Sequence, residues 1–316
     1  MSADFTPRKV ILDCDPGIDD AFAIAFGLGH PGLDLCGVTT VAGNVGLDLT
    51  TANALSVLEF LGRGDVPVAA GSPGPLLRPV WEDARQVHGA GGLGDARLPA
   101  PRGGPADAHA VDFLIERVAA APGEVTLVAT GPLTNVALAV RRYPALVTQV
   151  ADFVIMGGSA GRGNVSPAAE FNIAADPEAA AIVFGAGWRV TMAGLDVTLQ
   201  ARATPGVQDR LRALGRLAGD LLLPGLGGYR STAGDGQPVH DVCALALVAA
   251  PGLFGCEPAR VEVETQGRWT SGMTVTDFAA ADGQPNALVA LTLDVEGFWD
   301  LVLGAYARAA AVMAAG

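Results

Sequence analysis

The sequence contains a single lysine, Lys9, among its 316 residues. Schiff-base chemistry, pyridoxal-dependent catalysis and Walker-type nucleotide binding all place a lysine side chain beside the reacting group. Because Lys9 precedes the first apolar run of the chain, these chemistries are nearly excluded.

Basic charge is scarce throughout. The chain has 20 Lys and Arg residues against 33 Asp and Glu residues, which gives a formal net charge of −13. Nucleic acids and anionic membrane surfaces are bound through basic patches, so neither is expected as the main partner. We expect a neutral or cationic small ligand instead.

Cysteines are few and have no metal-binding or redox spacing. Cys14, Cys36, Cys243 and Cys256 lie in apolar stretches without a C-x-x-C pair, which is typical of reduced thiols in a cytosolic core. No uncharged run reaches the roughly 18 residues that a membrane helix needs. We therefore expect a cytoplasmic protein that does not associate with a membrane.

Half of the residues are hydrophobic, which is enough for a sizeable core, and no linker or repeat interrupts the chain. A single domain over residues 1–316 is expected. The predicted strands cover residues 10–12, 35–41, 66–70, 125–129, 153–156 and 189–193, and the predicted helices cover 19–29, 48–61, 110–120, 134–142 and a segment that begins at Asp176. This alternation predicts an α/β fold, with a mainly parallel central sheet, helices on both faces and a site at the C-terminal ends of the strands.

Three stretches interrupt the alternation and are rich in Gly, Pro and charged residues. They cover residues 72–107, 220–239 and 265–285. Loops of this length in a compact domain are usually functional or mobile. The third is flanked by strand-like segments at 261–264 and 273–276, so an antiparallel hairpin is an alternative for it.

Four carboxylates lie within eight residues, on a Pro-Gly turn after the first apolar run. They are Asp13, Asp15, Asp19 and Asp20, and no basic residue is interleaved among them. Like charges this close repel by roughly 4 kcal/mol per pair at an effective surface dielectric. The cluster therefore requires protonation or a cation, and oxygen-only ligands suit calcium or magnesium.

Other interpretations of this cluster are weaker. An EF-hand loop would need glycine and glutamate where the chain has Ile18 and Ile24. A phosphatase of the haloacid dehalogenase type also places Asp-x-Asp after a first strand, but it needs a later lysine. A helix cap at Asp19 with solvated neighbours explains one carboxylate rather than four.

Polar residues also follow two later segments. Asn164, Glu170 and Asn172 come after strand 153–156, at the sheet edge where the first cluster is expected, and amide and carboxylate groups placed there suit a sugar. An ordinary loop rich in polar turn residues is the alternative. His240 and Asp241 open an apolar helix, where a simple helix cap is the plainer interpretation of the pair alone.

Two turn-like segments remain ambiguous. Residues 89–94 match the dinucleotide-binding glycine pattern in letters, but they follow His88 in a long loop and lack both the preceding strand and the later acid, so we reject that match. Residues 130–135 end a buried strand and begin a helix. They are either pure turn chemistry or a place where the Thr130 carbonyl faces a metal.

Taken together, these motifs resemble the inosine-uridine-preferring nucleoside hydrolases, which are calcium-dependent N-ribohydrolases of α/β fold. The resemblance runs from Lys9 to about Asp277. Its signature, Asp-x-Asp-Pro-Gly-x-Asp-Asp after a strand, is highly specific and is complete here. The supporting segments are residues 41–44, 130–135, 164–172 and 240–241.

The resemblance implies a metal site. Calcium would be held by Asp15, Asp20 and Asp241 together with the main-chain oxygen of Thr130. Asp13 would support these ligands from behind. Water and the ribose 2- and 3-hydroxyls would complete the coordination.

The resemblance also implies a ribose site. Asp19 and Asn44 would bind hydroxyls on one side of the sugar. Asn164, Glu170 and Asn172 would hold the other side, including the 5-hydroxyl.

For catalysis, the resemblance implies that Asp15 is the base for the attacking water and that His240 protonates the leaving base. His88, Tyr229 and Trp81 lie in loops expected to close over the base, with His88 as a substrate-binding residue. Ser271 stands where many relatives have a basic residue, which leaves the role of that segment open.

The implied function is hydrolysis of the N-glycosidic bond of ribonucleosides to ribose and free base by a calcium-bound water, in purine or pyrimidine salvage. A non-catalytic nucleoside- or ribose-binding protein of the same fold is the alternative, and a metal-dependent phosphatase is a weak third. Relatives are commonly homodimers or homotetramers, so self-association is expected. The preferred base stays open.

Overall fold

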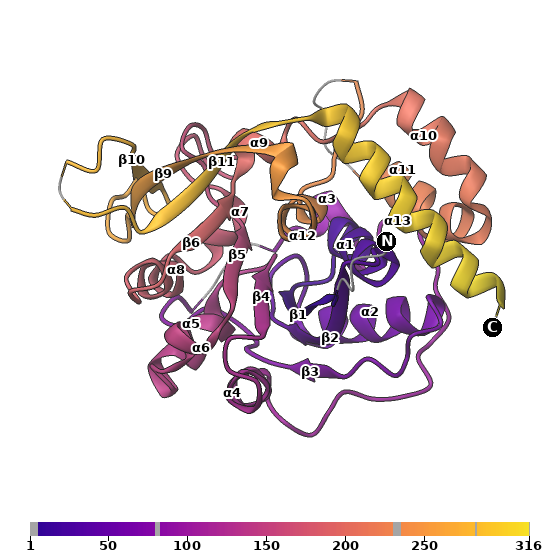
Figure 1. Ribbon diagram of the computed structural model, residues 1–316, viewed down its shortest axis with the longest axis horizontal. Coiled ribbons are helices and arrows are strands. Elements are labelled where there is room, and N and C mark those ends of the chain that lie inside the picture. Colours follow the sequence, from indigo (N-terminus) through magenta and orange to yellow (C-terminus); the bar gives the residue numbers. More distant parts are fainter. Residues whose placement is uncertain (1–5, 80–82, 230–234, 282, 316) are drawn as a thin grey trace.

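The computed structural model describes residues 6–79, 83–229, 235–281 and 283–315 (Figure 1). Its centre is a nine-stranded sheet with the order β10-β9-β11-β6-β5-β4-β1-β2-β3. Every pairing from β3 to β11 is parallel, and only β9 and β10 join it in antiparallel fashion. The predicted α/β class with a mainly parallel sheet is therefore confirmed.

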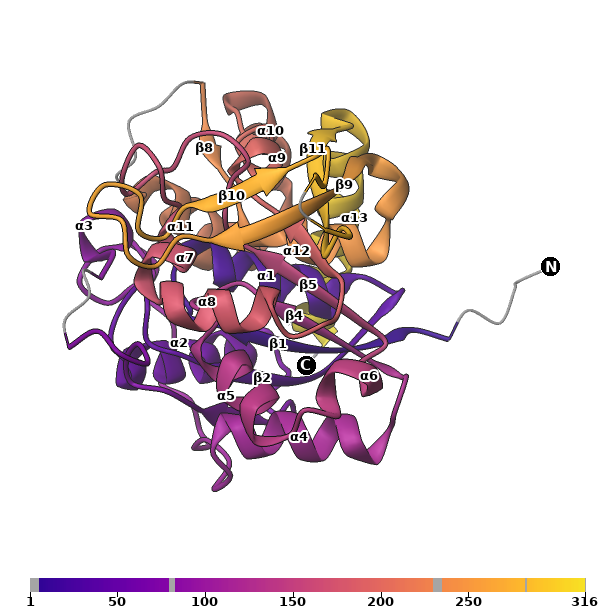
Figure 2. The same ribbon diagram turned by 90° about the vertical axis from the view of Figure 1, so that its left-hand side faces the viewer.

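The strands of this sheet are β1 (Arg8–Cys14), β2 (Leu33–Thr40), β3 (Val68–Ala70), β4 (Val125–Ala129), β5 (Asp152–Met156), β6 (Val190–Ala193), β9 (Phe254–Val263), β10 (Thr274–Asp277) and β11 (Ala287–Leu293). A separate antiparallel pair consists of β7 (Arg202–Ala203) and β8 (Gln237–Pro238). Figure 2 shows the β9–β10 hairpin on the side of the molecule opposite α4 (Ala110–Ala120).

Alternate residues of the strands face opposite layers, so the sheet has a hydrophobic core on each side. Val10 and Leu12 of β1 belong to one core, and Ile11 between them belongs to the other. The first core is covered by α1 (Ile18–Gly29), α2 (Leu47–Phe60), α9 (Leu195–Thr198), α10 (Pro205–Leu211), α11 (Leu223–Gly228), α12 (Asp241–Ala249) and α13 (Val295–Ala315). The second is covered by α4, α5 (Thr134–Arg142), α6 (Leu146–Gln149), α7 (Phe171–Ala175) and α8 (Pro177–Phe184), as Figure 1 shows.

The strand order reverses direction between β1 and β4. From β1 the chain continues outward to β2 and β3, whereas β4, β5 and β6 follow one another on the opposite side. Crossover helices leave in opposite directions at such a switch point, and the gap between them at the carboxyl ends of the strands receives ligands. The acidic segment predicted from the sequence begins at the end of β1 and therefore lies at this point.

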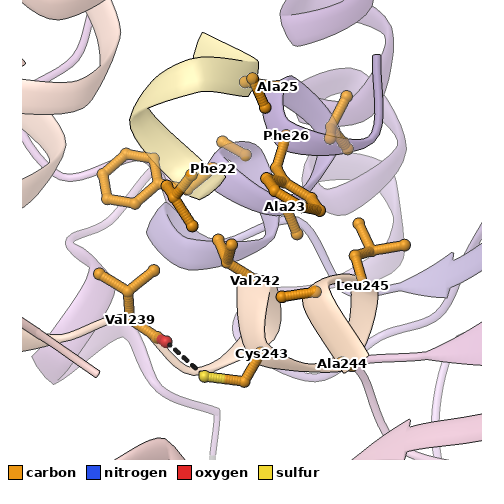
Figure 3. Close-up of a cluster of buried hydrophobic side chains, with 14 of the residues drawn as sticks. Phe22, Ala23, Ala25, Phe26, Val239, Val242, Cys243, Ala244 and Leu245 are labelled. Atoms are coloured by element: carbon orange, nitrogen blue, oxygen red, sulfur yellow. Dashed lines mark hydrogen bonds between the residues drawn. The ribbon is translucent and has the colours of Figure 1, made fainter. Parts of the chain in front are cut away.

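Helices α1 and α12 pack against each other beside the switch point (Figure 3). Phe22 and Phe26 of α1 and Val242 and Leu245 of α12 are all at most 3% exposed. Both helices are apolar almost all round, which is typical of buried helices. Their packing carries the first turn of α1, with Asp19 and Asp20, and the first residue of α12, Asp241, to the same edge of the sheet.

Two of the three expected loops contain more structure than predicted. Residues 220–228 of the segment 220–239 are helical, because η2 (Leu217–Leu222), a π-helical turn, runs into α11. Leu217, Leu221, Leu222 and Leu226 of these two elements are buried. In the described residues of the long segment 72–107, which exclude 80–82, the short helix α3 (Arg85–His88) is the regular element found. The third is the predicted hairpin, with Thr274 paired to Val263.

The remaining differences lie at element ends and in the last third of the chain. Strand β3 begins at Val68 rather than at residue 66, since Pro67 precedes it and has no N–H to donate to the ladder. Trp188 and Trp299 are both buried. No helix in the described part of the chain combines the length and hydropathy of a membrane span.

Candidate active site

A cavity of about 390 Å³ opens at the switch point. Its floor is polar and comes from the ends of several strands and helices: Asp19, Asn44, Thr130, Glu170, Asn172 and Asp241 all line it. Each of these side chains is at most 7% exposed. A cavity of this size and polarity suits a small ligand that carries hydroxyl groups.

Asp15 and Asp20 lie directly behind this floor and are fully buried. Asp20 caps helix α1, because its Oδ2 accepts from the N–H of Gly17 at 2.9 Å, while its Oδ1 accepts from the hydroxyl of Thr130 at 3.0 Å. Oδ2 of Asp15 accepts from the backbone N–H of Asn44 at 2.7 Å. Its other oxygen, Oδ1, is buried and meets no donor among the described residues. That orphaned oxygen is available to a cation or a water.

Glycines leave room for the Asp15 carboxylate. A Cβ at Gly43 would lie 2.1 Å from Asp15 Oδ2, and a Cβ at Gly131 would lie 2.8 Å from Asp15 Oδ1. Real Cβ atoms do not approach oxygen this closely, so both positions require glycine. The segments 41–44 and 130–135 therefore belong to the site through their backbones.

Asp19, Asp20 and Asp241 form the tightest acidic group. Each offers a carboxylate oxygen, and the three oxygens lie within 4.8 Å of one another. Burial, followed by repulsion from Asp20, raises the pKa of Asp19 to about 7. The pKa values of Asp20 and Asp241 are also raised, in both cases chiefly by burial. Three buried acids that resist ionisation without a counter-charge can hold a metal ion.

This grouping differs in one detail from the set that the resemblance implies. Asp19, expected to bind ribose, stands in the group with Asp20 and Asp241, whereas Asp15 does not belong to it. The negative charge of Asp20 nevertheless raises the pKa of Asp15, after burial, so the two carboxyls are close enough to interact. The structure thus brings four carboxyl groups together at one place, those of Asp15, Asp19, Asp20 and Asp241.

Asp13 lies beneath the floor and does not line the cavity. Its Oδ1 accepts from the Thr39 hydroxyl at 2.6 Å and from the Asn135 amide at 2.8 Å. Burial raises its pKa to about 6. Asn135 also donates to the Thr40 carbonyl and accepts from the N–H of Ser72, so it ties Asp13 to three segments. Sequence reasoning missed this role, although the turn at 130–135 was its available signal.

The opposite wall is organised by Glu170. Its Oε1 accepts from the N–H of Asn172 at 3.0 Å and its Oε2 accepts from the N–H of Ile173, so the carboxylate caps helix α7. Oε2 also accepts from Gly158, which follows β5, at 2.9 Å. Burial raises the pKa of Glu170 to about 7 despite these hydrogen bonds. The predicted site residue is therefore also a structural cap.

Asn172 connects the two walls of the cavity. Its amide nitrogen donates to the carbonyl of Thr130 at 2.8 Å and to the carbonyl of Met156 at 3.0 Å. The side-chain oxygen thereby points away from both strand ends, and Asn172 lines the cavity. Asn164, more exposed, accepts from the N–H of Phe171 at 2.9 Å and lines the cavity mouth.

Two histidines line the cavity above the acidic floor. Nδ1 of His88 accepts from the N–H of Ile18 at 3.1 Å, and its ring packs edge-on against Tyr229 at 5.6 Å between centroids. Nδ1 of His240 is 2.8 Å from the hydroxyl of Thr198. Burial lowers the pKa of His88 to about 3 and that of His240 to about 4. Both rings are therefore neutral at neutral pH and offer N–H groups.

The cavity has an apolar side next to these rings. Val165, Phe171, Leu195, Leu199 and Tyr229 line it, and Val165 and Leu199 are 52% and 43% exposed. Such a surface suits a flat heterocyclic ring. These positions were not predicted, apart from Tyr229, because isolated apolar residues in a half-apolar chain carry no signal of their own. Trp81 lies outside the described residues.

Ser271 is contacted by a positively charged side chain from a distant part of the chain. The Arg78 guanidinium donates to the Ser271 hydroxyl at 2.9 Å and pairs with both carboxylate oxygens of Glu178. It also donates to the carbonyl of Thr265. The segment around Ser271 is thereby joined to α8 and to the 72–79 segment, so it serves the structure at this position.

Comparisons with known proteins identify the family of the chain. The profile of the family described as inosine-uridine preferring nucleoside hydrolase matches residues 10–300. The non-specific ribonucleoside hydrolases RihC of Salmonella newport and Salmonella typhimurium are each 48% identical to the chain over 302 residues, which covers 95% of the chain and 98% of each relative.

Solved structures of the same kind superpose over nearly the whole chain. A purine-preferring ribonucleoside hydrolase from Gardnerella vaginalis has a TM-score of 0.90 at 33% identity and covers 98% of this chain and 100% of its own. A plant nucleoside hydrolase has a TM-score of 0.87 at 36% identity and covers 95% of this chain and 99% of its own. The chain belongs to the inosine-uridine preferring nucleoside hydrolase family and is an enzyme that hydrolyses ribonucleosides to ribose and free base.

Proposed function

We propose that the acidic floor of the cavity binds the ribose and that the base lies between the two histidines and the apolar wall. Three features support this arrangement: the six polar residues on the floor, the cavity volume of about 390 Å³, and the apolar side at its mouth. Asp19, Asn44, Asn164, Glu170 and Asn172 are proposed to bind the ribose hydroxyls, and His88 to contact the base.

The charge of the floor suits the reaction. Breaking an N-glycosidic bond creates positive charge near the ring oxygen and the anomeric carbon of the sugar. Buried carboxylates stabilise that charge more than they stabilise the neutral substrate, and this difference lowers the barrier. The proximity of Asp19, Asp20 and Asp241, with oxygens within 4.8 Å, is the single observation that carries the proposal.

The residues present fit a calcium ion. Asp15, Asp20, Asp241 and the main-chain oxygen of Thr130 would hold it, and Asp13 would support them from behind. The orphaned Oδ1 of Asp15 and the raised pKa values of the acids both favour a hard cation with oxygen ligands. When bound, calcium would orient a water molecule and make it more acidic.

Asp15 is proposed as the base that takes the proton of the attacking water. The oxygen of that water bonds to the anomeric carbon, and the electrons of the broken C–N bond pass to the departing nucleobase. His240, at the cavity wall, is proposed to donate a hydrogen bond from the N–H of its neutral ring to the departing nitrogen, so that the nucleobase leaves as a stabilised anion and then takes a proton from solvent. No covalent intermediate is needed, because the water attacks directly.

Base selection is proposed to be broad. The relatives from Salmonella are named non-specific ribonucleoside hydrolases, and the base side of this cavity is formed largely by apolar side chains, which accept rings by shape. A role in nucleoside salvage, a cytoplasmic location, a single domain over residues 1–316 and assembly into homodimers or homotetramers are proposed together with this function. The four free thiols support the cytoplasmic location.

The test uses inosine, uridine, cytidine and adenosine, with reducing sugar as the readout. Purified enzyme is assayed as prepared, after chelation, and after calcium or magnesium is restored. Calorimetric titration measures the binding of each ion directly. Calcium is expected to restore turnover and to bind more tightly than magnesium. Full activity of the chelated enzyme, or full activity of Asp15→Asn, would contradict the metal and base assignments.

A further inference from the structure

Thr198 is buried behind the wall of the cavity and touches His240 rather than the ligand space. Its side chain is fully buried, and its hydroxyl lies 2.8 Å from Nδ1 of His240. Thr198 ends helix α9, which follows β6, whereas His240 immediately precedes α12. The contact therefore joins two segments that approach the site separately.

The backbone around this contact is well held. The N–H of Thr198 donates to the carbonyl of Gly194 at 3.0 Å, and the N–H of Val239 donates to the carbonyl of Ala201 at 2.9 Å. Just beyond, Arg202 pairs with Pro238 in the β7–β8 ladder. These backbone bonds place the hydroxyl and the imidazole opposite each other before any ligand binds.

The direction of this hydrogen bond follows from a proton count. A threonine hydroxyl has one proton, and in the part of the chain that the structure describes Nδ1 of His240 is the acceptor found for it. If Nδ1–H donated instead, the buried hydroxyl proton would be left without an acceptor, at a cost of about 1–3 kcal/mol. The arrangement with Thr198 as donor satisfies both groups.

A histidine whose Nδ1 accepts carries its proton on Nε2 when the ring is neutral. His240 lines the cavity while Nδ1 is turned toward the buried Thr198, so Nε2 is the ring nitrogen left for the ligand. The proposed role of His240 requires a proton on this nitrogen. The other tautomer, with its proton on Nδ1, would present the lone pair of Nε2 to the departing base and would repel it.

We propose that Thr198 is a positioning residue that holds His240 with Nε2–H directed at the leaving base. This inference rests on the proposed function of His240 as the leaving-group donor. It predicts that the hydroxyl of residue 198 affects the rate only for substrates whose leaving group needs a hydrogen-bond donor.

The experiment compares Thr198→Val, which keeps the shape and removes the hydroxyl, with Thr198→Ser, which keeps the hydroxyl. Inosine and uridine need assistance to depart, whereas the 4-nitrophenolate of 4-nitrophenyl riboside leaves as a stable anion. For Thr198→Val, kcat on the nucleosides is expected to fall about 10- to 100-fold, part of the roughly 10²–10⁴ that a general acid supplies. Its kcat and KM on the nitrophenyl riboside should stay within about twofold, and Thr198→Ser should recover most of the lost rate.

A matched control separates catalysis from packing. Thr51 is a buried threonine in α2 whose hydroxyl pairs with that of Thr40 at 2.8 Å, outside the cavity. Thr51→Val should lose a similar hydrogen bond and a similar amount of stability, with kcat unchanged on both kinds of substrate. Thr198→Ala is a second hydroxyl-free variant should the valine fail to fold.

Parallel measurements on His240→Ala distinguish failure of the inference from failure of the proposed function. An equal loss on nucleosides and nitrophenyl riboside in His240→Ala would refute the leaving-group role. A selective loss in His240→Ala, with no selective loss in Thr198→Val, would refute only the role of Thr198. If the inference holds, Thr198→Val has no further effect on nucleoside turnover in the His240→Ala background.

The tautomer of His240 can also be determined by NMR, independently of any activity measurement. The chain has four histidines, and comparison of ¹⁵N-histidine spectra of wild type and His240→Ala assigns the His240 signals. Wild type and Thr198→Ser are expected to show a protonated Nε2 and an unprotonated Nδ1. Thr198→Val should show a mixture of tautomers, and an unchanged spectrum would overturn the proposal.

Discussion

Asp20 of α1 and Asp241 of α12 bring carboxylate oxygens within 4.8 Å of each other at the carboxyl edge of the sheet. The two residues are far apart in the sequence, so no local motif brings their carboxylates together. The contact results from the packing of α1 against α12, where Phe22, Phe26, Val242 and Leu245 are buried (Figure 3). The apolar core is therefore the element that assembles the acidic site.

Thinning that core should weaken the site. Leu245→Ala removes a fully buried side chain at the α1–α12 contact and should lower the free energy of unfolding by about 2–5 kcal/mol. Because the helix ends then shift, calcium affinity should fall on the order of 10-fold. The matched control is Leu114→Ala, in α4 on the other face, which is also fully buried. Urea unfolding and calcium titration of both variants provide the check, and equal losses of calcium affinity would exclude this link.

The space around Asp15 should tolerate no added carbon. Gly43→Ala places a Cβ 2.1 Å from Asp15 Oδ2, so the carboxylate must move and kcat on inosine should fall at least about 100-fold. Gly46→Ala is the matched control, since its added Cβ meets nothing within 4 Å. Steady-state kinetics with circular dichroism would test this, and a folded, fully active Gly43→Ala would rule out the requirement.

Glu170 should make the protein less stable as the pH rises. Burial raises its folded-state pKa to about 7, above the value near 4.3 of an unperturbed glutamate. Between these values the folded state binds more protons than the unfolded chain, so the contribution of this group is fully present below about pH 4 and is lost as the pH rises through about 7. The difference in free energy of unfolding between wild type and Glu170→Gln separates the contribution of Glu170 from those of the other acids.

Urea unfolding of both proteins in chelator at pH 5 and pH 8 measures the difference. The stability of wild type relative to Glu170→Gln is expected to be lower at pH 8. A constant difference across this range would show that Glu170 ionises normally.

Removing one acid should stabilise the metal-free protein and abolish its response to metal. Asp241→Asn relieves repulsion within the buried group, so its urea midpoint in chelator should exceed that of wild type. The rise in Tm that calcium produces in wild type should disappear, and turnover should fall by more than about 100-fold. Asp107→Asn, at an exposed position, is the control and should behave as wild type. A calcium-dependent rise in Tm that persists in Asp241→Asn would contradict the ligand assignment.

The elements near the N-terminal half of the site were predictable, because local patterns specify them. Strands with buried residues on both faces read as continuous apolar runs, and the Pro-Gly turn with its acids marks the end of β1. Residues 220–228 were predicted wrongly as part of a loop, since the glycines and the proline there obscure the buried leucine pattern of η2 and α11. Thr198 and Asn135 act through contacts with residues distant in sequence. The turn at 130–135 marks the position of Asn135 but not its partner Asp13, and the neighbours of Thr198 in sequence give no sign of its contact with His240.

The sequence by itself determined the chemistry available to this protein: a single lysine outside the site, an excess of acids, and four carboxylates that require a cation. Only the tertiary structure decided which acids meet, with Asp19 beside Asp20 and Asp241, and which nitrogen of His240 is engaged. The physical reason is range. Composition and local spacing set charge and backbone preference along the chain, whereas distances between remote side chains depend on how buried helices pack against the sheet.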